Sequence, residues 1–458
     1  MSEPLWTSAA IAEAASGSAN ADFTVNGVTF DSREVGAGDL FLALKGEVTD
    51  GHRFLDAAFD RGAAGSVVSD ATAHPHVRVA DTMAALNALG VAARARTDAK
   101  IIGVTGSVGK TGTKEALFAA LDRCDPGAAH RSVKSYNNHT GVPLSLSRMP
   151  AATRFGIFEM GMNHAGELAA LTRLVRPHVA IVTAIAPAHT AFFKDESAIA
   201  DAKGEIFQGL EPGGTAIVPF DSPHRDRLIA AAQPHAARIV TFGLNEGADV
   251  RAIEHMRVPE GGTFVTARLG EHELSYTMRQ PGAHWVSNSL AILAAVDAVG
   301  ADLGLAGLAL ADFGGLAGRG ARLKVALDGG EALVIDESYN ANPSSMRATL
   351  AVLGQEPARR KLAVLGDMRE LGSESAAYHA ALADPVDEAG VVRAILVGEE
   401  MTALANALEG RVDFVHVPDA AAARDRLTAE LTPGDAVLIK GSNAIGLASV
   451  VSALAGRG

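Results

Sequence analysis

Cysteine is almost absent from this sequence. Cys124 is the only cysteine among 458 residues, so no intramolecular disulfide can form. A chain without disulfides suits a reducing compartment. Cys124 falls near the expected end of a helix, and we interpret it as a structural residue rather than a nucleophile.

Long apolar runs are also lacking. No stretch reaches the ~18 uninterrupted apolar residues that a membrane-spanning helix needs. The first residues, Met1 to Trp6, contain neither a basic segment nor an apolar one, as a secretion signal would. We therefore predict a cytoplasmic protein without stable membrane insertion.

Positive charge is in deficit. Lys and Arg number 40 against 53 Asp and Glu, which gives a net charge of −13. Binding to a nucleic-acid backbone favours a basic face, so we predict no nucleic-acid partner. The length and the 48% hydrophobic content indicate a globular chain of two to four domains.

What the chain does contain is a strand, a glycine-rich loop and a helix around residues 101–121. The strand is expected at Ile101 to Thr105, because these residues are apolar or β-branched and end at a glycine. The helix is expected from Thr111. Four loop residues follow the strand and precede Lys110: Gly106, Ser107, Val108 and Gly109.

This order is typical of a phosphate-binding loop. Glycines let backbone N–H groups close around phosphate oxygens, and the helix N-terminus adds partial positive charge. Lys110 is expected to reach the β- and γ-phosphates of ATP, and the Thr111 hydroxyl to bind Mg²⁺. The pattern departs from the common spacing at one position, since Val104 stands where glycine is usual.

Two further strands end in chemically useful side chains. Glu159 closes the expected strand 155–159, and His189 follows the strand 179–185. Because ligands of parallel sheets bind beyond the carboxyl ends of the strands, these residues and Thr111 point to one active site with a divalent metal. Lys203, expected at a helix start, is by its pattern alone a solvated surface lysine.

The alternation of strands and helices predicts an α/β fold of three domains. We expect a small N-terminal α/β domain at 1–81, a central ATP-binding domain with a mostly parallel sheet at 82–317, and a C-terminal Rossmann-like α/β domain at 318–458. The glycine-rich stretch 313–320 reads as a hinge before the third domain.

Other polar residues leave two interpretations open. Arg33 and Lys45, at strand or loop ends of the first domain, are either solvated loop charges or part of a pocket for an anionic ligand such as a nucleotide diphosphate. Asn288 lies near the start of an Ala/Leu-rich helix and is a weak candidate for contact with a nucleotide base.

With these segments in place, the whole chain resembles the Mur ligase family, the ATP-dependent amide-forming enzymes of peptidoglycan synthesis. Within the family it looks most like the branch that adds D-alanyl-D-alanine to a UDP-N-acetylmuramoyl-tripeptide. Besides the phosphate loop, the resemblance rests on motifs at 136–143, 159–167, 203–207, 338–343 and 365–372.

The resemblance implies an activity and its reactants. ATP converts the terminal carboxylate of the tripeptide to an acyl phosphate, which the amine of D-alanyl-D-alanine attacks. The third domain would bring the dipeptide and close on ATP. The family implies two Mg²⁺ ions, a carbamylated Lys203 and a monomeric enzyme.

The resemblance also implies roles for individual residues. Lys110, Glu159, His189 and Lys203 would be catalytic, the last three together with Thr111 as metal ligands. Residues of all three domains would bind ATP or the nucleotide-peptide: for ATP, Asn288, Arg319, Asp336, Tyr339 and Asn340 besides the phosphate loop; for the nucleotide-peptide, Ser32, Arg33, Lys45, Gly46, Asn137 and Asn138.

Two departures limit this transfer. Trp285 stands where many relatives have Asn, which suggests stacking in place of a polar contact. The spacing between Arg319 and Asp336 is long, so Arg322 competes for the arginine role. Alternatives are another Mur-type or folylpolyglutamate-type ligase, or a nucleotide-gated switch protein with the same loop.

Overall fold

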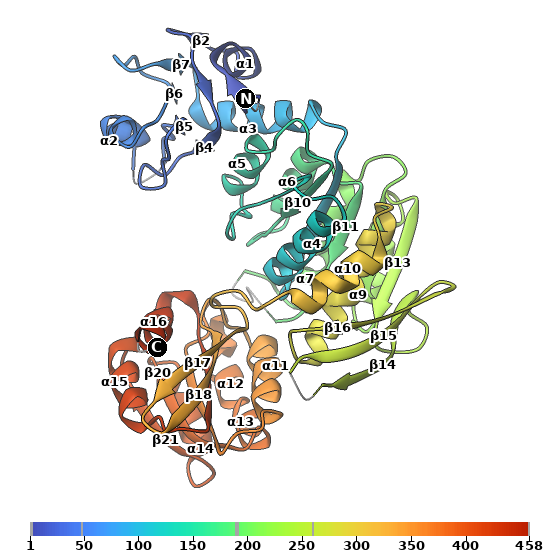
Figure 1. Ribbon diagram of the computed structural model, residues 1–458, viewed down its shortest axis with the longest axis vertical. Helices are drawn as coiled ribbons and strands as arrows, with labels where there is room; N and C mark the ends of the chain where they lie inside the picture. Colours follow the sequence, from blue (N-terminus) through green and yellow to red (C-terminus); the bar gives the residue numbers. More distant parts are fainter. Residues whose placement is uncertain (1–2, 47–48, 188–191, 259–260, 457–458) are drawn as a thin grey trace.

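The three larger of the four β-sheets formed by the described residues divide the molecule into N-terminal, central and C-terminal domains. The computed structural model describes residues 3–46, 49–187, 192–258 and 261–456. In Figure 1 the domains follow one another from the blue N-terminal end to the red C-terminal end. The predicted three-domain α/β fold is confirmed. No helix within the described ranges is long and apolar enough to cross a membrane.

The N-terminal domain has a small sheet in the order β2-β7-β6-β5-β4, and a separate pair of β1 and β3. Its elements are β1 (Trp6–Thr7), α1 (Ser8–Ala14), β2 (Ser18–Ala19), β3 (Thr24–Val25), β4 (Gly27–Thr29), β5 (Asp39–Leu42), a 3₁₀ turn (Gly51–Phe54), α2 (Leu55–Asp60), β6 (Gly65–Val68), β7 (His76–Arg78) and α3 (Thr82–Ala95).

Residues 24–29 of this domain form two short strands, not one. Residues 24–30 alternate like a single strand, but β3 pairs with β1 and β4 pairs with β5 in the other sheet. The break falls at Asn26, whose N–H donates to the Gly38 carbonyl. The alternating pattern does not reveal this break, because alternation records which face is buried and not which neighbouring strand is paired.

The helix α3, which leads into the central domain, also closes the N-terminal core. Leu86 and Leu89 are fully buried and pack with Leu42 and Val67 of that domain. Leu144 from the central domain joins the same cluster. The apolar side of α3 is therefore shared between the first two domains.

The central sheet has nine strands in the order β16-β15-β14-β13-β12-β11-β8-β10-β9. It is parallel from β9 to β14, and β15 and β16 add an antiparallel edge. The strands are β8 (Lys100–Thr105), β9 (Ala129–Arg131), β10 (Phe155–Glu159), β11 (Val179–Val182), β12 (Thr215–Pro219), β13 (Arg238–Gly243), β14 (Val250–Arg257), β15 (Thr263–Leu269) and β16 (His272–Met278).

Helices cover both faces of the central sheet. One face carries α4 (Lys110–Cys124), α9 (Ala283–Ala298) and α10 (Leu303–Asp312). The remaining helical elements of the central domain pack on the opposite face. They are α5 (Gly141–Ser147), α6 (Glu167–Val175), α7 (Glu196–Gly204), the 3₁₀ turn Glu205–Gly209 and α8 (Arg225–Ala232).

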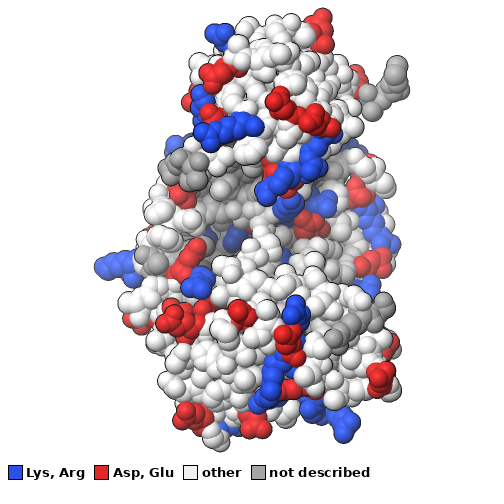
Figure 2. All heavy atoms as spheres, turned by 90° about the vertical axis from the view of Figure 1, so that its left-hand side faces the viewer, with Lys and Arg blue, Asp and Glu red and all other residues white. Residues whose placement is uncertain are grey.

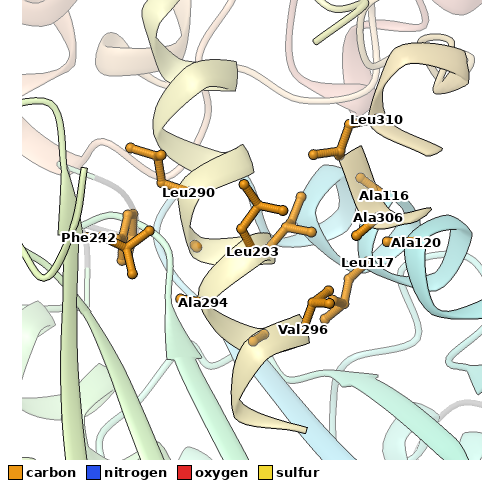
Figure 3. Close-up of a cluster of buried hydrophobic side chains, with 14 of the residues drawn as sticks. Ala116, Leu117, Ala120, Phe242, Leu290, Leu293, Ala294, Val296, Ala306 and Leu310 are labelled. Atoms are coloured by element: carbon orange, nitrogen blue, oxygen red, sulfur yellow. The ribbon is translucent and has the colours of Figure 1, made fainter. Parts of the chain in front are cut away.

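Strand β8 lies in the interior of the central sheet and buries apolar side chains on both faces of that sheet. Ile102 and Val104 join the core under α4 and α9, whereas Ile101 joins the core of the opposite face. This is why the strand reads as a continuous apolar run and not as an alternating one. Figure 3 shows the first core, where Leu290 of α9 lies beside Phe242 of β13, and Leu293 lies on the side of α9 that faces α4 and α10.

The C-terminal domain has a six-stranded sheet in the order β17-β18-β22-β19-β20-β21, parallel except for β17. Its strands are β17 (Ala321–Leu327), β18 (Gly330–Glu337), β19 (Arg360–Gly366), β20 (Val391–Val397), β21 (Asp413–Val417) and β22 (Asp435–Lys440). Its helices are α11 (Pro343–Gly354), α12 (Ser375–Ala380), α13 (Ala383–Glu388), α14 (Thr402–Leu408), α15 (Ala420–Glu430) and α16 (Ala448–Ala455), with 3₁₀ turns at Gly372–Glu374 and Asn443–Ile445.

Candidate active site

The loop between β8 and α4 has the geometry of a phosphate-binding loop. Gly106 has φ +150°, and a Cβ there would lie 2.0 Å from the Thr183 hydroxyl oxygen. Gly109, with φ +85°, is the N-cap of α4. Only glycine fits both positions. The Lys110 ammonium donates to the Gly106 carbonyl at 2.7 Å, across the loop. Helix α4 begins at Lys110, one residue before the expected start.

Glu159 meets this loop because β10 lies beside β8. The two strands are parallel, and Glu159 pairs in register with Val104. One carboxylate oxygen accepts from the Thr111 hydroxyl at 2.9 Å, and the other accepts from the Asn137 amide at 2.8 Å. Glu159 is 1% exposed. A buried carboxylate and a hydroxyl at this distance are hard oxygen donors of the kind that Mg²⁺ prefers.

Lys203 is a buried residue of this neighbourhood, not a surface lysine. It lies in the last turn of α7, so the prediction of a helix start was wrong. The side chain is 1% exposed. Burial, and then the charge of Lys110, lower the pKa of Lys203 well below its ordinary value. The pKa of Lys110 is also lowered by burial, which the Glu159 carboxylate opposes and Arg319 reinforces.

A cavity of about 490 Å³ joins these residues to the C-terminal domain. Its lining includes the predicted metal ligands Glu159 and Lys203. It also includes most of the predicted ATP residues: Ser107, Val108, Gly109, Lys110, Thr111, Asn288, Arg319, Tyr339 and Asn340. Figure 2 shows one face of the molecule hollowed between its upper and lower parts, with Lys and Arg side chains facing the hollow. A cationic cavity of this size suits a nucleotide triphosphate.

Arg319 reaches the cavity and Arg322 does not. The Arg319 guanidinium lies 4.2 Å from the Tyr339 ring centre and donates to the Ser135 hydroxyl at 3.2 Å. Arg322 instead donates to the buried Glu356 carboxylate at 2.6 Å. The geometry thus favours Arg319 for contact with a ligand in the cavity.

Asp336 holds the backbone turn that precedes Arg319. Its carboxylate is 4% exposed and accepts from the Gly318 N–H at 2.6 Å and from the Ser338 hydroxyl at 2.6 Å. Asp336 does not line the cavity. Its position fixes the turn from which Arg319 projects.

The start of α9 closes another side of the cavity. Asn288 lies against Gly109, where an added Cβ would come within 3.1 Å of its amide oxygen. Trp285 is 6% exposed; it packs on Gly112 of α4 and lies 5.8 Å from the Phe313 ring. Trp285 therefore lines the cavity mainly as a wall between α4 and α9, with its faces largely covered.

The candidates of the N-terminal domain lie apart from this cavity. Ser32, Arg33, Lys45 and Gly46 are not among its lining residues. Arg33, 84% exposed in its side chain, makes two hydrogen bonds to Asp31 at 2.9 and 2.7 Å. This pairing lowers the pKa of Asp31 to about 2.

Three remaining candidates differ in position. Asn137 lines the cavity, whereas the side chain of Asn138 accepts from the N–H groups of Thr140 and Gly141 at the start of α5. His189 lies outside the described residues. Within the described ranges, no three His, Cys, Asp or Glu side chains form a metal-binding group.

Sequence reasoning did not identify three ionisable residues of the cavity wall. Lys440, at the end of β22, donates to the Asn340 carbonyl at 2.9 Å and lies 3.5 Å from the Glu337 carboxylate. Burial raises the pKa of Glu337 and lowers that of Lys440, while the attraction between them opposes both shifts. Burial, aided by Lys440, lowers the pKa of His284 to about 4. The polar stretch after β22 was visible in the sequence, but its approach to α9 depends on how two domains pack.

Family models match most of the chain. The model described as Mur ligase family, catalytic domain, matches residues 24–119; the Mur ligase middle domain matches 104–296; the Mur ligase, glutamate ligase domain, matches 321–443.

Individual relatives match over nearly the whole length. A UDP-N-acetylmuramoyl-tripeptide–D-alanyl-D-alanine ligase of Escherichia coli is 34% identical, over 96% of this chain and 95% of that protein. A crystal structure of MurF from Acinetobacter baumannii superposes with a TM-score of 0.85 at 31% identity and covers 99% of both chains. MurF from Thermotoga maritima, solved with ADP, shares the fold with a TM-score of 0.79 at 24% identity, over 94% of this chain and 98% of that one.

Proposed function

The chain belongs to the Mur ligase family, and we propose that it joins D-alanyl-D-alanine to a UDP-N-acetylmuramoyl-tripeptide at the expense of ATP. A curated relative and a solved structure that match almost its whole length carry this activity in their names. The observation that carries the proposal within this chain is the shared cavity. It combines a phosphate-binding loop, a buried carboxylate and an arginine of the third domain.

The residues of the cavity fit phosphoryl transfer to a carboxylate. A free carboxylate is a poor acyl donor, and conversion to an acyl phosphate supplies a leaving group. Lys110 and the N-terminus of α4 would offset charge on the β- and γ-phosphates of ATP. Arg319 would approach the same phosphates from the third domain, held by the turn that Asp336 fixes. Asn288, Tyr339 and Asn340 would hold the base and ribose.

The donor set fits Mg²⁺ at one end of the cavity. Thr111 and Glu159 offer a hydroxyl and a carboxylate oxygen 2.9 Å apart, close to where the phosphates of ATP would lie. A bound divalent ion supplies charge neutralisation at the transferred phosphoryl group. We further propose His189 and Lys203 as ligands of a second ion.

Lys203 fits this role only as its carbamate. An ammonium beside a divalent cation would be repelled, whereas a carbamate is an anionic oxygen donor. Only a neutral amine reacts with CO₂, and burial beside Lys110 favours the neutral form of Lys203. Intact-mass spectrometry of native protein, with and without added bicarbonate, measures the expected gain of one carboxyl group.

The other reactants are assigned to the flanking domains. We propose that Ser32, Arg33, Lys45 and Gly46 face the uridine diphosphate end of the nucleotide-peptide, and that Asn137 and Asn138 lie along its peptide. The C-terminal domain would bring the dipeptide amine to the acyl phosphate. The proposal includes a monomeric, cytoplasmic enzyme, consistent with the single cysteine.

The test is phosphate release from ATP with the nucleotide-tripeptide, measured with and without D-alanyl-D-alanine. Mass spectrometry of the product identifies the bond formed. We expect release that requires both reactants and a product heavier by one dipeptide unit. Release with a different amine would keep the family and reject this substrate, and no release with any muramoyl-peptide would reject the proposed function.

A further inference from the structure

A lysine outside the described machinery is completely buried beside it. Lys114 lies on α4, one turn beyond Lys110, and its side chain has no exposed surface. From sequence alone a lysine in this helix reads as a solvated residue. Burying an ammonium is unfavourable unless its donors are all satisfied, so its partners indicate why it is there.

Three acceptors surround the Lys114 ammonium. It donates to the Ser132 carbonyl at 2.9 Å and to the Lys134 carbonyl at 2.6 Å, and it lies 2.9 Å from the Glu115 carboxylate. An ammonium has three N–H donors. Two of them donate to these carbonyls, and the Glu115 carboxylate pairs with the charge. The Glu159 carboxylate, 3.9 Å away, adds electrostatic attraction.

Two of these acceptors belong to one loop, residues 132–138, which we call the bridging loop. It connects β9 to the turn before α5 and contains two residues that line the cavity, Ser135 and Asn137. Lys134, in the middle, has φ +54°, which is unusual for a residue with a side chain. Since this conformation is strained, contacts from outside the loop must maintain it.

The bridging loop is also where the three domains meet. Lys134 and Tyr136 contact Glu34 of the N-terminal domain, Asn137 contacts Glu159 of the central domain, and Ser135 contacts Arg319 of the C-terminal domain. A loop with partners on three domains needs a fixed base. Lys114 is the buried group that attaches it to α4.

We propose that Lys114 is a positioning residue that holds the bridging loop against α4, so that Ser135 and Asn137 keep their places at the phosphate-binding loop. Lys114 touches no reactant itself. The effect of Lys114 on ligation rests on the proposed function, in which Asn137 lies along the muramoyl-peptide. The effect of Lys114 on the bridging loop is independent of that function.

The test variant is Lys114→Met, which keeps an unbranched side chain, one atom shorter than that of lysine, and removes all three donors. Hydrogen–deuterium exchange of the full chain, read on peptides covering 132–138, measures the loop directly. We expect these amides to exchange about tenfold faster, since two carbonyls lose their donor, while α4 stays protected. Exchange equal to that of the unchanged protein overturns the proposal.

Kinetics provide the second readout. We expect the KM for the nucleotide-tripeptide to rise about tenfold while the KM for ATP changes less than about twofold, because Lys110 and Thr111 are untouched. A lower melting temperature with both KM values unchanged would mean that Lys114 only stabilises the fold, which contradicts the proposal. If the unchanged protein ligates nothing, the proposed function fails and the exchange result still decides the role of Lys114.

Two further variants complete the design. Lys114→Gln keeps two N–H donors on a shorter chain and is expected to show a smaller change in the same direction; it carries the test if Lys114→Met does not fold. Lys100→Met removes an exposed lysine from the other end of β8 and serves as the matched control. We expect wild-type exchange in the bridging loop and wild-type KM values for the control.

Discussion

The cavity and the N-terminal domain both contain charged candidate residues, but the structure holds them differently. Around the phosphate-binding loop, Glu159 is buried and bonded to Thr111 and Asn137. In the N-terminal domain, Arg33 is exposed and bonded only to a neighbour in the chain. Groups held by distant partners are already in place for a ligand, whereas exposed ion pairs contribute little and can exchange partners. Substitutions in the cavity should therefore affect turnover most, and those in the N-terminal domain should affect substrate affinity.

The largest effect is expected for Lys110→Ala. Loss of the cation at the phosphates should lower the rate of ligation by roughly 10³-fold. The fold should be unaffected, since among the described residues the ammonium donates a hydrogen bond only to a carbonyl of its own loop. Steady-state rates with circular dichroism melts measure both, and Lys100→Ala is the matched control. Ligation at a near-normal rate would remove the ATP site from this cavity.

A smaller loss, of about 10²-fold, is expected for Glu159→Gln. The amide oxygen can still accept from Thr111, so the variant removes charge with little change in shape. The Mg²⁺ concentration that gives half-maximal rate should rise. An unchanged Mg²⁺ dependence would show that Glu159 has no part in metal binding.

Substitutions of Arg319 and Arg322 should affect different quantities, catalysis for the first and stability for the second. Arg319→Ala should reduce kcat/KM by about tenfold or more, because it removes the cation that the C-terminal domain brings to the cavity. Arg322→Ala should leave the rate near normal and lower stability by about 1–3 kcal/mol, because Glu356 loses a buried partner. Kinetics and urea titrations on both variants test this, and reversed outcomes would assign the ligand contact to Arg322.

The smallest effect is expected for Arg33→Ala. Without the guanidinium, the pKa of Asp31 should rise from about 2 toward its ordinary value of 3.8. A lowered folded-state pKa stabilises the protein above the unfolded value, and this contribution is lost as pH falls from about 3.8 through about 2. The variant should lack that acid dependence. An NMR titration of Asp31 measures the shift, and an unchanged pKa would contradict the pairing.

The sequence was sufficient to predict that two residues following strands of the same sheet lie close together. Thr111 and Glu159 were predicted to lie in one site because the loop before Thr111 follows one strand of a parallel sheet and Glu159 ends another. In the structure the two strands are neighbours, and the two side chains share a hydrogen bond. This inference needs only strand order and the rule that carboxyl ends align.

Other features were not predictable because they depend on packing between segments far apart in the chain. Lys203 was placed at the wrong end of its helix, since the true N-cap, Asp195, lies in a polar stretch with several possible starts. Lys114 and Lys440 look like surface lysines, and only the approach of a loop or another domain buries them. Arg319 and Arg322 are equivalent in the sequence; the acceptor Glu356 separates them.

The central claim is that this cavity transfers the γ-phosphoryl group of ATP to the carboxylate of the tripeptide. The most direct measurement uses nucleotide-tripeptide with ¹⁸O in its terminal carboxylate and follows the label during ligation to D-alanyl-D-alanine. Formation of an acyl phosphate predicts one ¹⁸O atom in each phosphate released. Phosphate without ¹⁸O, released alongside ligated product, would contradict it.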